Sequence, residues 1–142
     1  MKKMSIIYWS NGGNVEVLAN KIKEGAESSN ANVNMKLVSE AKIQDVTESD
    51  VVAFGSPSMD NNRIEQLEME PFINEFKMLP VNGKKVALFG SYGWDNGQFM
   101  EDWKEKMKDY GFDVIDTLVV RETPNEQQLN NAYDLGKKLA NL

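Results

Sequence analysis

The sequence predicts an α/β fold, a doubly wound sheet of five parallel strands with helices on both faces. Short apolar runs rich in β-branched residues alternate with stretches of helical hydrophobic spacing along the 142-residue chain. The runs are almost continuously apolar, which is typical of parallel strands buried on both faces. Right-handed crossovers then leave few topologies, of which the doubly wound sheet is the simplest. The length suits one domain, residues 1–142.

The first half of the chain is expected to supply three strands. Residues 4–9 and 51–54 predict buried strands, and the stronger alternation over 33–38 predicts a half-covered edge strand. A helix follows the first strand with Asn14 as its N-cap, and a short helical turn is expected near residues 43–46. The inner stripe of the first helix is Val15, Leu18, Ala19, Ile22 and Ala26.

The second half is expected to supply two strands, 86–89 and 113–120, and three helices. Pro71 suits the first position of one helix, Gly111 suits the C′ position of the next, and Thr123 opens a capping box with Pro124 at the first position of the last. The expected inner faces of these helices are Phe72, Ile73, Phe76 and Leu79; Phe99, Met100, Trp103, Met107 and Tyr110; and Leu129, Ala132, Tyr133, Gly136, Leu139 and Ala140.

The composition excludes several kinds of chemistry. The chain has no Cys and no His, so Cys or His nucleophiles, Ser-His-Asp triads, Cys/His zinc sites and thiolate-held iron–sulfur clusters are impossible. We therefore expect no metal, and an electron carrier of this composition needs an organic cofactor. The net charge of −6 repels nucleic acid and anionic membranes and favours a partner with a basic patch.

The amino terminus does not resemble a targeting segment. It is basic and then briefly apolar, and the polar stretch that begins at Ser10 interrupts it far short of a signal peptide or a membrane span. We expect a cytoplasmic protein that is a monomer.

Ligands of doubly wound sheets bind outside the carboxyl ends of the strands, which directs attention to three loops. The loop after the first strand has two glycines and opens a helix, an arrangement that binds anions and most naturally phosphate. Its donors would be neutral, because the loop contains no Lys or Arg. Taken alone, the stretch is better explained as a simple Gly-rich turn, because Gly and Asn are common turn residues, and it matches neither the P-loop nor the dinucleotide fingerprint. Its residues are Ser10, Asn11, Gly12, Gly13, Asn14 and Val15.

The loops after the third and fourth strands add a Met and a Trp. Trp94 is flanked by flexible and acidic residues, which disfavours a core position and suggests a stacking platform for a flat ligand. Taken alone, a Trp folded back over the neighbouring helix fits the stretch equally well. Met59 alone would suit an ordinary surface loop. The convergence of the three loops favours a flat ligand that carries a phosphate. The candidate residues are Ser56, Pro57, Ser58, Met59, Asp60, Asn61 and Asn62, and then Ser91, Tyr92, Gly93, Trp94 and Asp95.

At these residues the chain resembles the short-chain flavodoxins over almost its whole length. The most specific stretch is Gly83–Trp94, and Glu70-Pro71-Phe72, Met59 and Tyr8-Trp9-Ser10 match as well. The resemblance implies the strand order 2-1-3-4-5 and non-covalently bound FMN. It also implies a low-potential one-electron carrier that shuttles between redox partners and is not an enzyme.

The resemblance further implies a role for each loop. Residues 10–15 would wrap the FMN phosphate, and backbone groups of residues 91–95 would contact the pyrimidine edge of the flavin. Trp94 would stack on the outer face of the ring and Met59 on the inner face. The turn of residues 59–62 would face the flavin atoms N5 and N3.

Four positions depart from the family pattern. Gly12 and Val15 stand where the family's Ser-x-Thr-Gly-Asn-Thr loop has threonines, so we expect FMN affinity below the typical value. Asp60 replaces a usual Gly, although Asp60 and Asn61 suit a type II turn because Asn tolerates positive φ. Asn62 replaces a frequent Glu and still offers an oxygen to N3–H.

The acidic residues around the site predict its redox behaviour. Negative charge disfavours the anionic, fully reduced flavin and so lowers the potential of the second reduction step. The acids concerned are Asp60, Glu65, Glu68 and Asp95. An acidic rim would also dock basic redox partners in brief encounters.

Two alternatives stay open and one does not. A flavin reductase using NAD(P)H would need a nicotinamide site, usually on extra loops, and no insertion is visible. A dedicated flavodoxin-like activator of an enzyme such as ribonucleotide reductase fits the altered phosphate loop but not the stretch from Gly90 to Trp94. A response-regulator receiver needs acids after the first strand and Asp after the third, where this chain has Trp9-Ser10 and Gly55-Ser56.

Overall fold

The structure, a computed structural model, describes residues 2–11, 13–59, 63–93 and 96–142. Five strands form one parallel sheet in the order β2-β1-β3-β4-β5, which confirms the predicted fold class and strand order. The strands are β1 (Lys3–Tyr8), β2 (Asn32–Leu37), β3 (Val51–Gly55), β4 (Lys85–Tyr92) and β5 (Asp113–Arg121).

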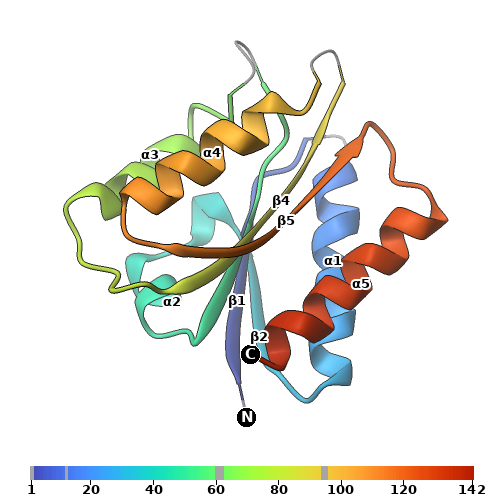
Figure 1. Cartoon of the computed structure of the whole chain (residues 1–142), viewed down its shortest axis with the longest axis horizontal. Helices are drawn as coiled ribbons and strands as arrows, with labels where there is room; N and C mark the ends of the chain where they lie inside the picture. Colours follow the sequence, from blue (N-terminus) through green and yellow to red (C-terminus); the bar gives the residue numbers. More distant parts are fainter. Residues whose placement is uncertain (1, 12, 60–62, 94–95) are drawn as a thin grey trace.

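Helices cover both faces of the sheet (Figure 1). Helices α1 (Asn14–Ser28) and α5 (Glu126–Ala140) lie on one face, and α2 (Ile43–Thr47), α3 (Met69–Asn74) and α4 (Gln98–Asp109) lie on the other. Two short 3₁₀ turns, η1 (Val38–Glu40) and η3 (Glu75–Lys77), extend the connections. The buried residues divide into two clusters, one on each face.

Helices α1 and α5 pack so closely that glycine is required at the crossing. A Cβ atom on Gly25 would lie 1.9 Å from the carbonyl oxygen of Tyr133, and one on Gly136 would lie 2.0 Å from that of Ile22. The predicted stripe of α1 is buried throughout. In α5, Leu129 and Tyr133 are half-exposed rather than core, and Leu135 takes the buried position instead.

The opposite face has an aromatic core. The ring of Phe76 packs edge-on against Phe72 and Phe112, with centroids 5.6 and 5.5 Å apart. Leu79 was expected on this face but is 39% exposed. The prediction is wrong because regular α-helix ends at Asn74 and the 3₁₀ turn that follows ends at Lys77, so the 3.6-residue period does not reach position 79.

Three helix starts differ from the predicted ones. The N-cap of α1 is Gly13, so Asn14 is the first helical residue and not the cap. Pro71 is the third residue of α3, still within the first turn where the missing N–H has no intrahelical acceptor. The cap of α5 is Asn125, whose side chain accepts from the N–H of Gln128, so the capping box lies two residues beyond Thr123.

Strand β4 is longer than predicted at its carboxyl end. The expected strand ended at residue 89, whereas β4 pairs with β5 as far as Tyr92, opposite Arg121. Ser91 and Tyr92 therefore belong to the strand and not to the loop that follows it. Gly111 follows α4 with a positive φ of 98°, as predicted.

Candidate functional site

The loops that follow β1, β3 and β4 lie at the carboxyl ends of these strands, and they lie side by side because the three strands are neighbours in the sheet. Backbone hydrogen bonds tie residues of the first and second loops to the ends of the neighbouring strands. The N–H of Trp9 donates to the carbonyl of Gly55 at 3.0 Å. The N–H of Ser58 donates to the carbonyl of Ser91 at 2.8 Å. The predicted convergence is therefore confirmed for the described parts of the three loops.

The first loop presents unpaired donors at the start of α1. Gly13 has a φ of 97° and caps the helix without a side-chain hydrogen bond. Within the described residues the N–H groups of Asn14 and Val15 have no acceptor. A Cβ atom on Gly13 would meet nothing within 4 Å. Ser10 is half-exposed, Asn11 is exposed and Gly12 lies outside the described residues.

The side chain of Val15 is buried at the start of α1. Val15 is 2% exposed and belongs to the cluster between α1, α5 and the sheet. It therefore offers a backbone N–H to a ligand and no hydroxyl. The polar groups of the first loop are all neutral, as the sequence predicts.

Glu16 places one acid in the first turn of α1. Its carboxylate accepts a hydrogen bond of 3.1 Å from the phenol of Tyr8. Burial, and then the bond to Glu16, raises the pKa of the Tyr8 phenol above its ordinary value. Tyr8 therefore stays protonated and keeps donating, which orients this carboxylate at the edge of the anion site.

Ser56 is a structural element of the second loop. The residue is 0% exposed. Its hydroxyl donates to the carbonyl of Pro57 and accepts from the N–H of Glu65, both at 2.9 Å. Both hydrogen-bonding roles of the hydroxyl are thus used inside the protein.

Met59 is the exposed residue of this loop, 39% accessible. Its N–H donates to the carbonyl of Arg63 at 2.7 Å, which closes a short turn. The candidate residues Asp60, Asn61 and Asn62 lie outside the described residues. Ser58 and Pro57 are half-exposed beside Met59.

Glu65 holds the rest of the loop in place, a role that the sequence analysis missed. It is 2% exposed, and its carboxylate accepts from the N–H groups of Leu67, Glu68 and Met69 at 2.7–2.8 Å. It thereby satisfies donors at the start of α3. The signal was available, since an acid shortly before a helix start commonly accepts from its first N–H groups.

The third loop begins at a buried strand end. Ser91 is buried and its carbonyl is bonded to Ser58. The carbonyl of Tyr92 accepts from the N–H of Glu122 at 2.7 Å, and the residue lines a cavity of about 300 Å³ with Thr117 and Val119. Gly93 is half-exposed with open space around it. Trp94 and Asp95 lie outside the described residues.

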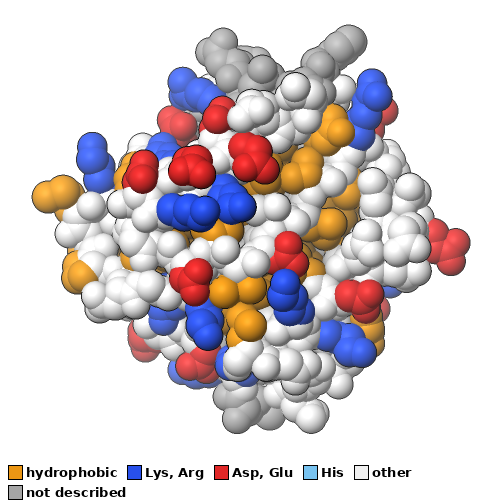
Figure 2. Space-filling model, in the orientation of Figure 1, with side chains coloured by type: hydrophobic (Ala, Val, Ile, Leu, Met, Phe, Trp, Pro, Cys, Tyr) orange, Lys and Arg blue, Asp and Glu red, His pale blue; other side chains and the backbone are white. Residues whose placement is uncertain are grey.

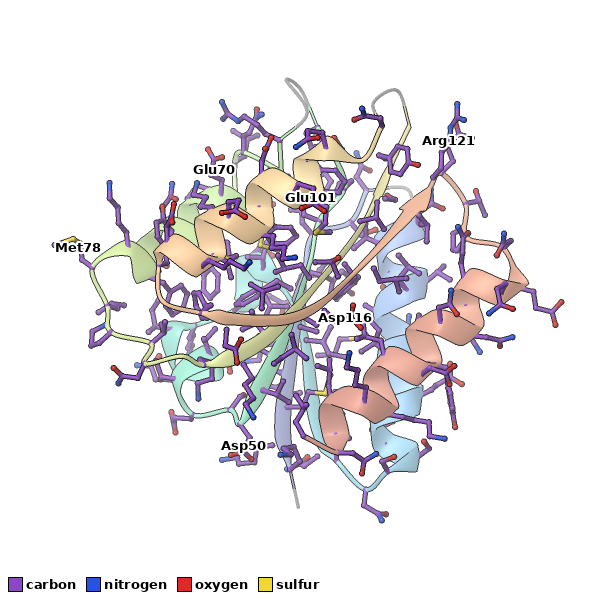
Figure 3. The ribbon with its side chains drawn as sticks, viewed as in Figure 1. Asp50, Glu70, Met78, Glu101, Asp116 and Arg121 are labelled. Atoms are coloured by element: carbon purple, nitrogen blue, oxygen red, sulfur yellow. The ribbon has the colours of Figure 1, made fainter. Side chains whose placement is uncertain are left out.

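A larger cavity, of about 580 Å³, lies at the opposite end of the strands, between the starts of β3 and β4. In Figure 3, Asp50 lies at this end of the strands, and Arg121 lies at the other end, where the three loops are. The ammonium of Lys84, which lines the cavity, donates to the carbonyls of Thr47 and Ser49. The lysine therefore ties α2 to the start of β4 and is not free for a ligand.

The described residues contain neither a membrane-spanning helix nor a cluster of metal-binding side chains. None of their helices is long and apolar enough to cross a membrane. They also contain no group of three or more His, Cys, Asp or Glu side chains arranged to hold a metal ion.

Known proteins resemble this chain over nearly all of its length. The family model of the flavodoxins matches residues 6–136. The flavodoxin of Clostridium beijerinckii is 41% identical over 140 residues, which cover 98% of this chain and 100% of that protein. The flavodoxin of Megasphaera elsdenii is 38% identical over 122 residues, 86% of this chain and 88% of that one.

Solved structures agree. The two-electron reduced flavodoxin of Megasphaera elsdenii superposes with a TM-score of 0.86 at 35% identity, covering 98% of this chain and 99% of that one. A flavodoxin from the domain Archaea gives a TM-score of 0.87 at 31% identity, with 98% and 96% covered.

FMN, the cofactor of this family, fits the geometry described above. N–H groups at a helix start that have no acceptor among the described residues suit a phosphate dianion. The exposed Met59 follows Ser58, whose N–H is bonded to Ser91 at the end of β4. The fold, the donor set and the family match therefore agree: this chain belongs to the flavodoxin family and is an FMN-dependent electron carrier.

Proposed function

We propose that the chain is a low-potential one-electron carrier that holds FMN at the joined ends of β1, β3 and β4. The observation that carries this proposal is a pair of N–H groups at the start of α1 that have no acceptor among the described residues, beside strand ends that backbone bonds tie to the neighbouring loops. FMN supplies the redox chemistry when bound. The protein's residues bind it, orient it and set the charge around it.

Residues 10–15 bind the phosphate in this proposal. The N–H groups of Asn14 and Val15 and the Ser10 hydroxyl donate, and the dipole of α1 adds a partial positive charge. Because no cation takes part, the attraction depends on short hydrogen bonds rather than on long-range charge. The affinity should therefore depend weakly on salt.

The flavin ring lies between the second and third loops. Met59 contacts its inner face, and Ser58 and the backbone of Ser91, Tyr92 and Gly93 line its edge. The buried Ser56 and Glu65 hold these groups at a distance and do not touch the ring. The roles of Asp60, Asn61, Asn62, Trp94 and Asp95 stay as the family resemblance implies them.

The electrostatics of the site favour a low potential. Glu68 is exposed beside the first loop, and its negative charge opposes a second negative charge on the cofactor. Arg63, the cation nearest the turn, is paired with Glu70 at 3.1 Å, and Lys106 approaches the same carboxylate at 3.9 Å. Figure 3 shows Glu70 near the start of α3. The pairing reduces the ability of Arg63 to offset the acids.

Redox partners with basic patches would dock transiently at the loop edge. The net charge is −6. On the face that Figure 2 shows, over β5, α4 and α5, acidic and basic side chains are interspersed and form no large region of one sign. We therefore expect the electrostatic attraction of basic partners to act at the loops rather than on this face. We expect a monomer located in the cytoplasm. Nothing in the described residues favours a flavin reductase or an enzyme activator instead.

Paired titrations with FMN and riboflavin test the proposal, because riboflavin lacks the phosphate. FMN should quench tryptophan emission of the apoprotein and bind far more tightly than riboflavin. Ser10→Ala should weaken FMN about fivefold and leave riboflavin unchanged. Equal affinities of the wild type for FMN and riboflavin would contradict the phosphate assignment. Rapid oxidation of NADPH by the FMN-loaded protein would favour a reductase.

A further inference from the structure

Trp9, the residue immediately before the phosphate loop, is held at two points. Its backbone N–H donates to the carbonyl of Gly55 at 3.0 Å. Its indole Nε1–H donates to the carboxylate of Glu68 at 2.9 Å, although the two residues are 59 positions apart. The ring is half-buried and packs against the cluster under α3 and α4. Backbone and side chain are thus fixed by different elements.

The acceptor is itself held in place. The N–H of Glu68 donates to the buried carboxylate of Glu65 at 2.7 Å, and the N–H of Glu65 donates to the hydroxyl of Ser56 at 2.9 Å. Ser56 adjoins Gly55, which accepts from the backbone of Trp9. The contacts form a closed circuit, Gly55–Ser56–Glu65–Glu68–Trp9, that begins and ends at the carboxyl end of β3.

We propose that Glu68 is a positioning residue for the phosphate loop, residues 10–15, and that it acts through the indole of Trp9. This inference rests on the proposed assignment of residues 10–15 to the FMN phosphate. Fixing the residue before Ser10 orders the start of the loop before the cofactor arrives, and less ordering entropy is then subtracted from the binding free energy. The circuit also connects the phosphate loop to the segment that carries the flavin-facing turn.

Charge and position make opposite predictions for Glu68. Its negative charge repels a phosphate, so a purely electrostatic role would make every neutral substitution tighten FMN binding. A positioning role depends on the acceptor oxygen. Glutamine keeps an oxygen that accepts from Nε1–H and loses the charge, whereas alanine loses both. Comparing the two neutral variants therefore separates the roles.

The experiment measures dissociation constants for FMN and riboflavin with Trp9→Phe, Glu68→Ala and Glu68→Gln. Trp9→Phe and Glu68→Ala should each weaken FMN by about threefold to tenfold. Both should leave riboflavin within about twofold of wild type, because riboflavin has no phosphate to place. Glu68→Gln should bind FMN at least as tightly as wild type. The double variant Trp9→Phe/Glu68→Ala should be no weaker than the weaker single variant, because both remove one interaction.

Glu75→Gln provides a matched charge control. Glu75 is an exposed acid in η3 with no partner among the described residues, and its loss should leave the ratio of FMN to riboflavin affinity unchanged. Glu68 is exposed, so its variants should fold, and urea unfolding of each apoprotein verifies this.

Two results would overturn the inference. Equal FMN affinities for Glu68→Ala and Glu68→Gln would show that only the charge matters. Equal losses for FMN and riboflavin would show that Trp9 does not act on the phosphate. If Ser10→Ala left the ratio of FMN to riboflavin affinity unchanged, the proposed assignment of residues 10–15 to the phosphate would itself be wrong, which is a separate outcome.

Discussion

Gly90 lies against the carbonyl oxygen of Ser56. A Cβ atom at position 90 would stand 2.1 Å from that oxygen and 3.0 Å from the ring of Phe99. Gly90 is therefore a point of close approach between β4 and the start of the loop after β3, just before two of the three candidate loops. The spacing of these loops depends on the absence of a side chain here.

We predict that Gly90→Ala destabilises the apoprotein by about 2 kcal/mol and weakens FMN binding. The methyl group meets backbone rather than a movable side chain, so the two loops must separate. Urea unfolding measures the first effect and fluorescence titration the second. Gly93→Ala is the stability control, because a Cβ atom there meets nothing within 4 Å. Equal stability of the two variants would contradict the steric explanation.

The order of the strands was predictable because it depends on long apolar patterns, whereas several element ends depend on partners elsewhere in the chain. Strand β4 extends to Tyr92 because Arg121 pairs with it. Helix α3 begins at Met69, where the buried carboxylate of Glu65 accepts its N–H. Arg121 is distant from Tyr92 in the sequence, whereas Glu65 stands shortly before the helix and offered a local signal that the sequence analysis missed.

The same distinction applies to the site. Its location followed from the rule that ligands bind after the strands of such sheets, and the neutral cradle followed from residue types. The roles of Ser56 and Glu65, which are buried and hold the second loop in place, were not predicted from the sequence. In the sequence, a buried serine and a buried glutamate look like the exposed polar residues around them. Their burial is decided by the fold.

Asp45 should contribute stability that disappears in acid. Burial alone raises its pKa, but the N–H of Lys42 and the ammonium of Lys36 outweigh burial and lower the net pKa below 3.8. The bonds are 2.8 Å to Lys42 and 3.1 Å to Lys36. A depressed folded pKa gives stability that is present above the unfolded value and lost as pH falls through the folded value.

Asp45→Asn should therefore be less stable than wild type at pH 7, by about 1 kcal/mol, and the difference should shrink below about pH 4. Urea unfolding at several pH values measures this. Asp109→Asn, at an exposed position on α4, controls for the loss of a carboxylate. A constant difference at all pH values would show that the charge of Asp45 is not responsible.

Asp116 should keep the exposed edge of β5 from pairing with another chain. The register of β4 and β5 passes from Val114 to Asp116 and leaves Ile115 unpaired, which is a bulge. The carboxylate of Asp116 accepts from the N–H of Thr117 at 2.8 Å and pairs with Lys138 at 3.1 Å. Figure 3 shows Asp116 beside this strand. Bulges and charges are common protections of edge strands.

We predict that Asp116→Val gives concentration-dependent self-association in sedimentation experiments. Valine favours extended backbone and leaves the N–H of Thr117 free to pair. Asp116→Asn is the matched control, because its side-chain oxygen still accepts from that N–H, and it should stay monomeric. A monomeric Asp116→Val at high concentration would mean that other features protect the edge.

Val15→Thr should change apoprotein stability and cofactor affinity in opposite directions. Val15 is 2% exposed in the core beside α5, so a hydroxyl there costs about 1 kcal/mol in the apoprotein. The backbone N–H of the same residue has no acceptor in the described part of the chain, so in the proposed site a threonine oxygen turned toward the loop gains a phosphate partner. FMN should bind about fivefold tighter, with riboflavin unchanged, because only the phosphate can accept from the new hydroxyl. Parallel losses of stability and FMN affinity would instead place the side chain at position 15 away from the phosphate. The replacement of the family's threonine by Val15 would then not explain a low FMN affinity.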